Sequence, residues 1–171
     1  MSIEQNSSEN VTSSLPLHGE GMPVGQERGC SEGRHIVYFS LGSNLGNKRE
    51  NLNKAIKLME EQIGVLVRQS AFLATEPWGF LSDNSFVNAA IRMETSLDPF
   101  EVLTKTHEIE RELGRTVKST NGEYHDRIID IDILLYDDLH INTPQLTIPH
   151  PLMEQRDFVM IPLREIVVGK I

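Results

Sequence analysis

The stretch DRIIDIDILLY, residues 126–136, combines a run of large aliphatic residues with two aspartates two positions apart. Successive side chains of a β-strand point to opposite faces of the sheet. One face of this stretch is therefore entirely apolar and consists of Ile129, Ile131, Ile133 and Leu135. The other face carries both aspartates and consists of Ile128, Asp130, Asp132, Leu134 and Tyr136. We predict a strand that buries the first face and holds two carboxylates on the second, with their Cα atoms about 6.6 Å apart.

The two aspartates form a candidate metal site. Two like charges at this separation repel, and burying them without a partner is costly. A divalent cation removes that cost, and Mg²⁺ prefers carboxylate oxygens while keeping positions for water and substrate phosphates. Two cations bridging a triphosphate are also compatible with this pair. The alternative is an edge strand whose outer face meets water, because Asp-x-Asp is a common pattern.

Composition excludes several classes of protein. The 171 residues, 39% of them hydrophobic, suit one domain with a sizeable core. A formal net charge of −9 argues against a general nucleic-acid or membrane-surface binder. Cys30 is the single cysteine, which argues against a disulfide framework or a cysteine-based zinc site. The sequence has no apolar run of membrane-spanning length and no signal-peptide pattern, so we expect a cytoplasmic protein.

The chain divides into two regions. Residues 1–34 are rich in Ser, Asn, Glu and Gly, and we predict a disordered tail there. Residues 35–171 are predicted to form one domain. Its expected elements are strand IVYFSLG, a helix from the Asn47 cap to Gly64, strands VLVRQSAFLAT and FVNAAIRMET, a helix from the Asp98 cap to Gly114, and the aspartate strand. This order predicts an α+β fold, a ferredoxin-like βαββαβ sandwich with an added C-terminal hairpin and short helix.

Basic residues flank the loop before the aspartate strand. Arg115, Lys118 and Arg127 offer planar and mobile cations that suit phosphate oxygens. We interpret the loop as a candidate phosphate-closing lid. The alternative is a solvated loop whose cations pair with Glu123 and Asp126.

Other polar and aromatic residues have two interpretations each. Phe86 and Asn88 share the non-core face of their strand and would suit a flat, hydrogen-bonding heterocycle. They could equally be a packed ring and a surface amide. His107 and Glu110, three apart on a helix, could contact a ligand or form a polar face. We expect Arg156 to contact phosphate, and no second histidine stands at ligand spacing from His150.

The ordered motifs GSNLG, FVNAA, HEIERELGR, DRIIDIDILLY and LTIPHPLMEQRDFV, spread over about residues 36–166, resemble the 6-hydroxymethyl-7,8-dihydropterin pyrophosphokinase family of the folate pathway. The resemblance implies transfer of a pyrophosphoryl group from ATP to the hydroxymethyl oxygen of the pterin, with release of AMP, in tetrahydrofolate biosynthesis. It implies ATP and the pterin as partners, no nucleic acid or membrane, and a monomer.

The resemblance also implies roles for individual residues. Asp130 and Asp132 would hold two Mg²⁺ ions, with Arg127 and Arg115 as further catalytic residues. The pterin would be bound by Phe86, Phe158, Asn88 and Tyr124, with groups around Gly42, Thr75 and Trp78. The ATP contacts would be His107, Glu110, Lys118, Ile133 through its backbone, Leu146, Thr147, His150 and Arg156. The sequence departs from the family pattern at HDR, where Gly-Pro-Arg is usual, and at Tyr124, where Trp is usual.

Two rival functions stay open at this level. One is a metal-dependent Asp-x-Asp enzyme acting on a nucleotide sugar. The other is a non-catalytic ferredoxin-like binding module. Release of labelled AMP from ATP plus pterin would separate the first rival from the pyrophosphokinase, and Mg²⁺-dependent ATP affinity would separate the second.

Overall fold

The computed structural model describes residues 33–76, 84–114 and 126–169, which belong to one compact unit. The predicted disordered tail, residues 1–34, lies almost wholly outside the described residues and stays a prediction. The described elements, in chain order, are β1 (His35–Ser43), α1 (Lys48–Gln62), β2 (Val65–Gln69), β3 (Leu73–Thr75), β4 (Phe86–Thr95), α2 (Pro99–Glu112), β5 (Asp130–Tyr136), β6 (Ile141–Asn142), β7 (Thr147–Ile148), the 3₁₀ turn Met153–Gln155 and α3 (Asp157–Ile166).

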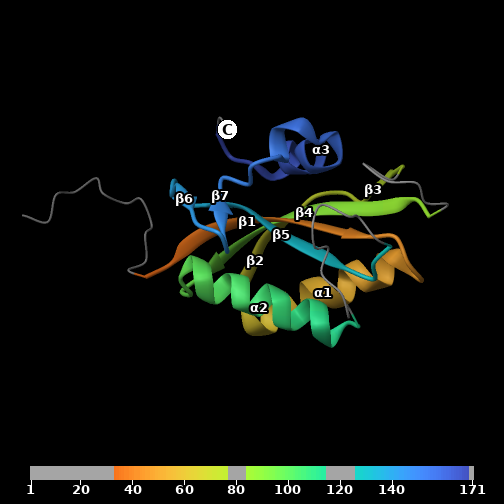
Figure 1. Ribbon diagram of the computed structural model, residues 1–171, viewed down its shortest axis with the longest axis horizontal. Helices are drawn as coiled ribbons and strands as arrows, with labels where there is room; N and C mark the ends of the chain where they lie inside the picture. The colour runs from red at the N-terminus through yellow and green to blue at the C-terminus, as the bar shows by residue number, and fades with distance from the viewer. Residues whose placement is uncertain (1–32, 77–83, 115–125, 170–171) are drawn as a thin grey trace, which may run out of the picture. The chain divides into compact units, whose positions relative to one another are not determined.

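One antiparallel sheet organises the fold. Its strand order is β2-β4-β1-β5, and β3 pairs with β4 beyond the end of β2. Helices α1 and α2 cover one face of the sheet, and α3 lies on the opposite face (Figure 1). Toward the C-terminus, β6 and β7 form a short hairpin that turns at residues 143–146, after the predicted turn at YDDLHIN, and α3 follows. The described part is thus a mixed α+β fold with an antiparallel sheet and three α-helices.

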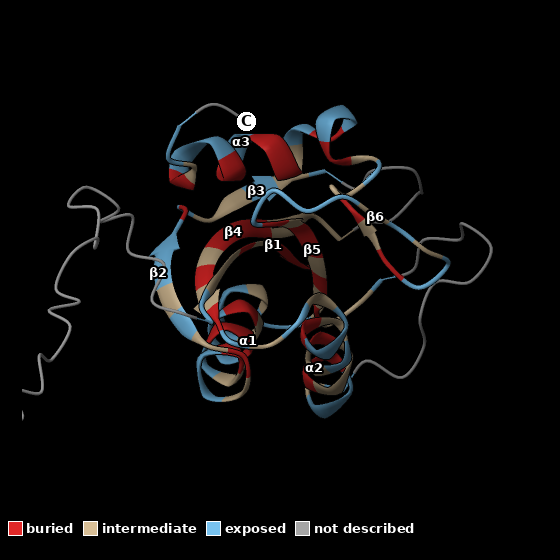
Figure 2. Cartoon of the chain, turned by 90° about the vertical axis from the view of Figure 1, so that its left-hand side faces the viewer, coloured by how far each residue is buried: buried red, intermediate tan, exposed pale blue. Residues whose placement is uncertain are grey.

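The main core lies between the sheet and the helices α1 and α2. The inward sides of these helices are buried, and their outward sides are exposed (Figure 2). The fully buried side chains at this layer include Phe39 and Leu41 of β1, Leu52 and Met59 of α1, and Ile109 of α2. A second, smaller cluster joins α3 to the other face of the sheet. In the described part of the chain, no helix is both long and apolar enough to cross a membrane.

Local capping signals define where the two long helices begin. The Asn47 side chain accepts a hydrogen bond from the backbone N–H of Glu50. Asp98 and Glu101 form a reciprocal capping box, and Pro99 occupies the first turn of α2. These side chains satisfy N–H groups that have no acceptor within the helix. The predicted helix starts are confirmed.

The predicted strand over residues 65–75 is interrupted, and β2 and β3 are separate. At the break, the Ser70 hydroxyl accepts a hydrogen bond from the backbone N–H of Ala90 and donates one to the carbonyl of Ala71. The N–H of Ala71 donates to the Glu165 carboxylate of α3 at 2.9 Å. The backbone N–H of Ser70 still donates to the carbonyl of Ala90 at 2.9 Å, so side-chain hydrogen bonds supplement the backbone pairing at the break.

The alternation in β5 holds at the aspartates and fails after them. Ile131 and Ile133 are buried in the main core as predicted. Ile133 of β5 pairs with Phe39, and Leu135 pairs with Tyr38, the residue next to Phe39, so Leu134 is an extra residue in β5. Leu135 and Tyr136 therefore do not lie on their predicted faces. Such a bulge reverses the facing of later side chains. Tyr136 therefore enters the main core, where its hydroxyl donates to the carbonyl of Leu97.

Gly64 is required by close packing where α1 leads into β2. A Cβ atom at this position would lie 2.0 Å from the carbonyl oxygen of Glu94. We expect Gly64→Ala to lower the free energy of unfolding by at least about 2 kcal/mol, because backbone must move to admit the methyl group. Gly46→Ala is the control: a Cβ there meets open space, and only its φ of +63° is unfavourable, at a cost of about 1 kcal/mol. Urea denaturation measures both, and an equal loss in the two variants would contradict the close-packing argument.

Candidate active site

An open pocket lies on the sheet face opposite α1 and α2, with about 510 Å³ of empty space when the part open to solvent is included. Four strands, β1, β3, β4 and β5, and the start of α3 contribute its walls. The lining residues are Ser40, Gly42, Thr75, Glu76, Phe86, Asn88, Arg127, Asp130, Asp132, Arg156 and Phe158. Segments far apart in the sequence therefore converge on one site.

The register of β1 explains why these side chains meet. Ser40 and Gly42 lie opposite Asp132 and Asp130 in β5, and Gly42 lies opposite Asn88 in β4. The alternation that buries the flanking residues of β1 directs these positions into the pocket. A Cβ atom at Gly42 would lie 2.9 Å from Oδ1 of Asn88. The glycine thus leaves room for the amide at the centre of the site.

Asp130 and Asp132 lie close together, and nearby arginines offset part of their negative charge. Nη1 of Arg127 lies 2.9 Å from Oδ2 of Asp130, and both side chains are largely shielded from solvent. Burial, and secondarily the charges of Asp130 and Glu110, raise the pKa of Asp132 to about 7, against the opposing effect of Arg156 and Arg127. Below about pH 7 the neutral form of Asp132 is therefore favoured, and a nearby cation would favour its ionised form.

Two expected ATP contacts lie beside the acidic pair but outside the pocket lining. Glu110 is buried, and its Oε1 accepts a hydrogen bond from the backbone N–H of Ile131 at 2.8 Å. His150 donates its backbone N–H to the carbonyl of Leu134. Burial and the positive charge of Arg156 lower the pKa of the His150 imidazole, although Asp130 opposes this. A neutral imidazole is the favoured form.

The other part of the pocket is aromatic and carries a fixed amide. Asn88 is 3% exposed, and its Nδ2 donates a hydrogen bond to Oγ1 of Thr75 at 2.7 Å. Phe86 and Phe158 belong to the same lining. The Arg156 guanidinium lies over the Phe158 ring, with Cζ 5.8 Å from the ring centroid. An apolar ring surface therefore adjoins a charged region within a single pocket.

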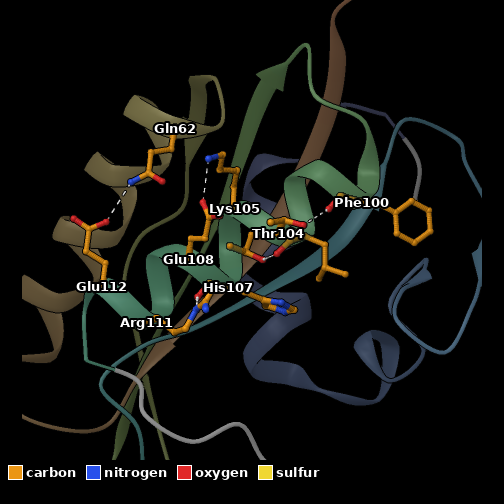
Figure 3. Close-up of polar contacts among 10 residues, drawn as sticks. Gln62, Phe100, Thr104, Lys105, His107, Glu108, Arg111 and Glu112 are labelled. Carbon is orange, nitrogen blue, oxygen red and sulfur yellow. Dashed lines mark hydrogen bonds and ion pairs between the residues drawn. The ribbon is translucent and has the colours of Figure 1, made fainter.

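The structure brings together nine of the predicted site residues: Gly42, Thr75, Phe86, Asn88, Arg127, Asp130, Asp132, Arg156 and Phe158. Outside the lining are His107, Glu110, Ile133, Leu146, Thr147 and His150. The side chains of Ile133 and Leu146 belong to the core. His107 projects from the side of α2 turned away from Gln62 and Glu112 (Figure 3). The predicted residues Trp78, Arg115, Lys118 and Tyr124 lie outside the described residues.

Two lining residues, Ser40 and Glu76, were missing from the sequence-based set. Ser40 has the same strand parity as Gly42, so alternation could have found it. Glu76 directly follows Thr75, and no periodic pattern in the sequence indicates that it lines the pocket. Among the described residues, no group of three or more His, Cys, Asp or Glu side chains is arranged to hold a metal ion. The candidate metal site thus has two protein carboxylates, with further ligands left to water and substrate.

Comparisons with known proteins agree with one another. The model of the family 7,8-dihydro-6-hydroxymethylpterin-pyrophosphokinase (HPPK) matches residues 38–168. A Porphyromonas gingivalis protein named 2-amino-4-hydroxy-6-hydroxymethyldihydropteridine pyrophosphokinase is 49% identical over 132 residues, covering 77% of this chain and 90% of its own. A Bacillus subtilis protein of the same name is 42% identical over 133 residues, with coverages of 77% and 78%.

Solved structures support the fold. A crystal structure of HPPK-DHPS in complex with substrates has a TM-score of 0.60 at 15% identity, and covers 78% of this chain. The wild-type Plasmodium falciparum HPPK-DHPS with pteroate has a TM-score of 0.62 at 16% identity, and covers 77% of this chain. This chain spans 40% and 38% of those two chains, respectively. From the family match and the close relatives together, the chain belongs to the 7,8-dihydro-6-hydroxymethylpterin-pyrophosphokinase family.

Proposed function

We propose that this protein transfers a pyrophosphoryl group from ATP to 6-hydroxymethyl-7,8-dihydropterin in tetrahydrofolate biosynthesis. The hydroxymethyl oxygen would bond to the β-phosphorus of ATP, the bond from that phosphorus to the α,β-bridging oxygen would break, and AMP would leave. The hydroxyl proton would pass to solvent. The observation that carries the proposal is one pocket in which two aspartates and two arginines adjoin two phenylalanine rings and a fixed amide.

The acidic part fits Mg²⁺. Asp130 and Asp132 are the residues that would hold it, and we propose two ions. Burial, and secondarily the negative charges of Asp130 and Glu110, raise the pKa of Asp132, and a bound cation would favour its ionised form. When bound, Mg²⁺ would neutralise phosphate charge and lower the pKa of the attacking hydroxyl.

The arginines would balance the charge of the phosphates. Arg127 is paired with Asp130 in the structure. With a cation bound by the Asp130 carboxylate, the Arg127 guanidinium would be able to contact a phosphate oxygen through two N–H groups. Arg156, at the start of α3, would contact the same chain of phosphates. Phosphoryl transfer requires mainly alignment and charge neutralisation from the protein, and these side chains supply both.

The aromatic part would bind the pterin. Phe86 and Phe158 offer ring faces for stacking, and Asn88 offers an amide to the polar edge of the heterocycle. Because Nδ2 of Asn88 already donates to Thr75, the orientation of the amide is fixed before the substrate arrives. The pterin would then face the phosphates across Gly42.

Several finer assignments belong to the same proposal. The strand order β2-β4-β1-β5, with α1 and α2 on one face, supports a ferredoxin-like sandwich. The further ATP contacts are His107, Glu110, Lys118, the Ile133 backbone, Leu146, Thr147 and His150, with Arg115 near the phosphates and Trp78 and Tyr124 near the pterin. We propose a cytoplasmic monomer without nucleic-acid or membrane partners.

The proposed reaction is tested by following AMP. Labelled ATP, Mg²⁺ and 6-hydroxymethyl-7,8-dihydropterin should give labelled AMP and the pterin diphosphate in equal amounts. Omission of either Mg²⁺ or the pterin should stop AMP formation. Absence of pterin-dependent AMP from the folded protein would defeat the proposal.

Asp132→Asn should lower turnover by at least about 1,000-fold, because a neutral amide cannot replace the cation-binding carboxylate. The measurement is the rate of AMP formation at saturating substrates, with circular dichroism to show that the fold is kept. Asp138→Asn is the control, since Asp138 is an exposed aspartate just after the same strand. Turnover in Asp132→Asn equal to that of the control would contradict the metal assignment.

The pH dependence of stability should report the buried carboxyl. Asp132 has a pKa of about 7 in the folded, metal-free protein, whereas the ordinary pKa of an aspartate in water is 3.8. Its ionisation therefore disfavours folding, with no effect below about pH 4 and the full effect above pH 7. In EDTA, Asp132→Asn should be more stable than the wild type by up to about 4 kcal/mol at pH 8, and about equal near pH 4. Urea denaturation over this range measures the difference, and a difference independent of pH would contradict it.

Asn88→Ala should raise the KM for the pterin by about 100-fold, because the polar edge of the heterocycle loses its partner. The KM for ATP should change little. Asn142→Ala, at an exposed position of β6, is the control and should change neither constant. An equal rise of both KM values in Asn88→Ala would show that the amide supports the whole pocket instead of one substrate.

A further inference from the structure

The side chain of Asn44, at the turn between β1 and α1, makes its contacts with two residues more than eighty positions away. Its Nδ2 donates to Oδ1 of Asp126 at 2.6 Å, and its Oδ1 accepts from the backbone N–H of Arg127 at 2.7 Å. Its own backbone N–H donates to the carbonyl of Arg127 at 3.1 Å. Asn44 has no exposed surface. Both functional ends of the amide are therefore used on one short segment.

The turn that carries Asn44 is itself fixed. Asn51 of α1 donates its side-chain amide to the carbonyl of Leu45 at 2.8 Å and to the hydroxyl of Ser43 at 3.2 Å. Asn47 caps the same helix. The strand–helix junction that carries Asn44 is thus held by its own hydrogen bonds. Asn44 therefore positions the Asp126–Arg127 segment, and not the reverse.

The held segment determines where Arg127 can reach. Arg127 lines the pocket, and its guanidinium lies against Asp130, three residues further along. An arginine side chain has many rotamers, so its placement depends on a fixed backbone. Asp126 also accepts a hydrogen bond from Asn84, two residues before Phe86. Through Asp126, Asn44 is therefore connected to Asn84, which lies just before the strand that carries Phe86. Through the backbone of Arg127, it is connected to the part of the pocket that holds Asp130.

We propose that Asn44 is a positioning residue, which orders the Asp126–Arg127 backbone so that the Arg127 guanidinium is presented to the transferred phosphates. This inference rests on the proposed function. A purely structural role would be stabilisation of the β1–α1 turn, independent of what Arg127 does. The two roles differ in one respect: positioning requires Arg127, and turn stabilisation does not.

The test is a double-mutant cycle on turnover. Asn44→Ala should lower kcat by about 10–100-fold, because a shift of about 1 Å at a catalytic group costs this much. The same change in an Arg127→Ala background should lower kcat by less than about threefold, since the group that Asn44 positions is gone. Equal factors in both backgrounds would overturn the proposal. Asn53→Ala, at an exposed site of α1, should leave kcat unchanged in both.

A reciprocal swap provides a second arm in case Asn44→Ala folds poorly. Asn44→Asp alone sets two carboxylates against each other at residues 44 and 126, and kcat should fall. Combining Asn44→Asp with Asp126→Asn reverses donor and acceptor, keeps the acceptor for the Arg127 N–H, and restores the net charge. We expect kcat to return to within about fivefold of the wild type. Recovery of thermal stability without recovery of kcat would overturn the proposal.

These outcomes are distinct from failure of the proposed function. A wild-type protein without pterin-dependent AMP formation would defeat the function itself. If the wild type is active, the results of the double-mutant cycle and of the reciprocal swap bear only on the role of Asn44.

Discussion

The pairing of β1 with β4 on one side and β5 on the other is the constraint on which the site depends. Gly42 lies opposite both Asn88 and Asp130, so the amide and the acidic pair are separated by a single strand. A reaction between two bound substrates needs their reacting atoms within contact distance. The central strand sets that distance through its backbone, and its small residues, Ser40 and Gly42, leave the space above it open.

The charge arrangement has a cost in the metal-free protein. Burial, and secondarily the charges of Asp130 and Glu110, disfavour ionisation of Asp132 and raise its pKa. The ion pair between Arg127 and Asp130 offsets part of this repulsion. If the site binds cations and polyphosphate as proposed, their binding would offset this cost. Local instability of this kind is expected at a functional site and needs compensation from the surrounding core.

Local signals in the sequence were sufficient for much of the fold, and long-range contacts explain the errors. The caps at Asn47 and Asp98 were predictable because each cap contacts residues two or three positions away. The faces of Asp130 and Asp132 followed from alternation. Alternation failed at Leu134, because a bulge depends on the partner strand. The break near Ser70 depends partly on the hydrogen bond between Ala71 and Glu165, which are 94 residues apart, and no local pattern reveals that contact.

The start of α3 connects the two halves of the pocket. Arg156 precedes the helix and Phe158 lies in its first turn, so one short segment supplies a cation and a ring surface to the pocket. The guanidinium over the ring couples their positions. This segment is held by the packing of Val159 and Leu163 with Ala90 and Leu134. Because Ala90 and Leu134 belong to the strands that carry Asn88 and Asp132, the same packing that docks α3 also aligns both halves of the site. Two rigid parts, the sheet and the start of α3, therefore determine how the substrates would face each other.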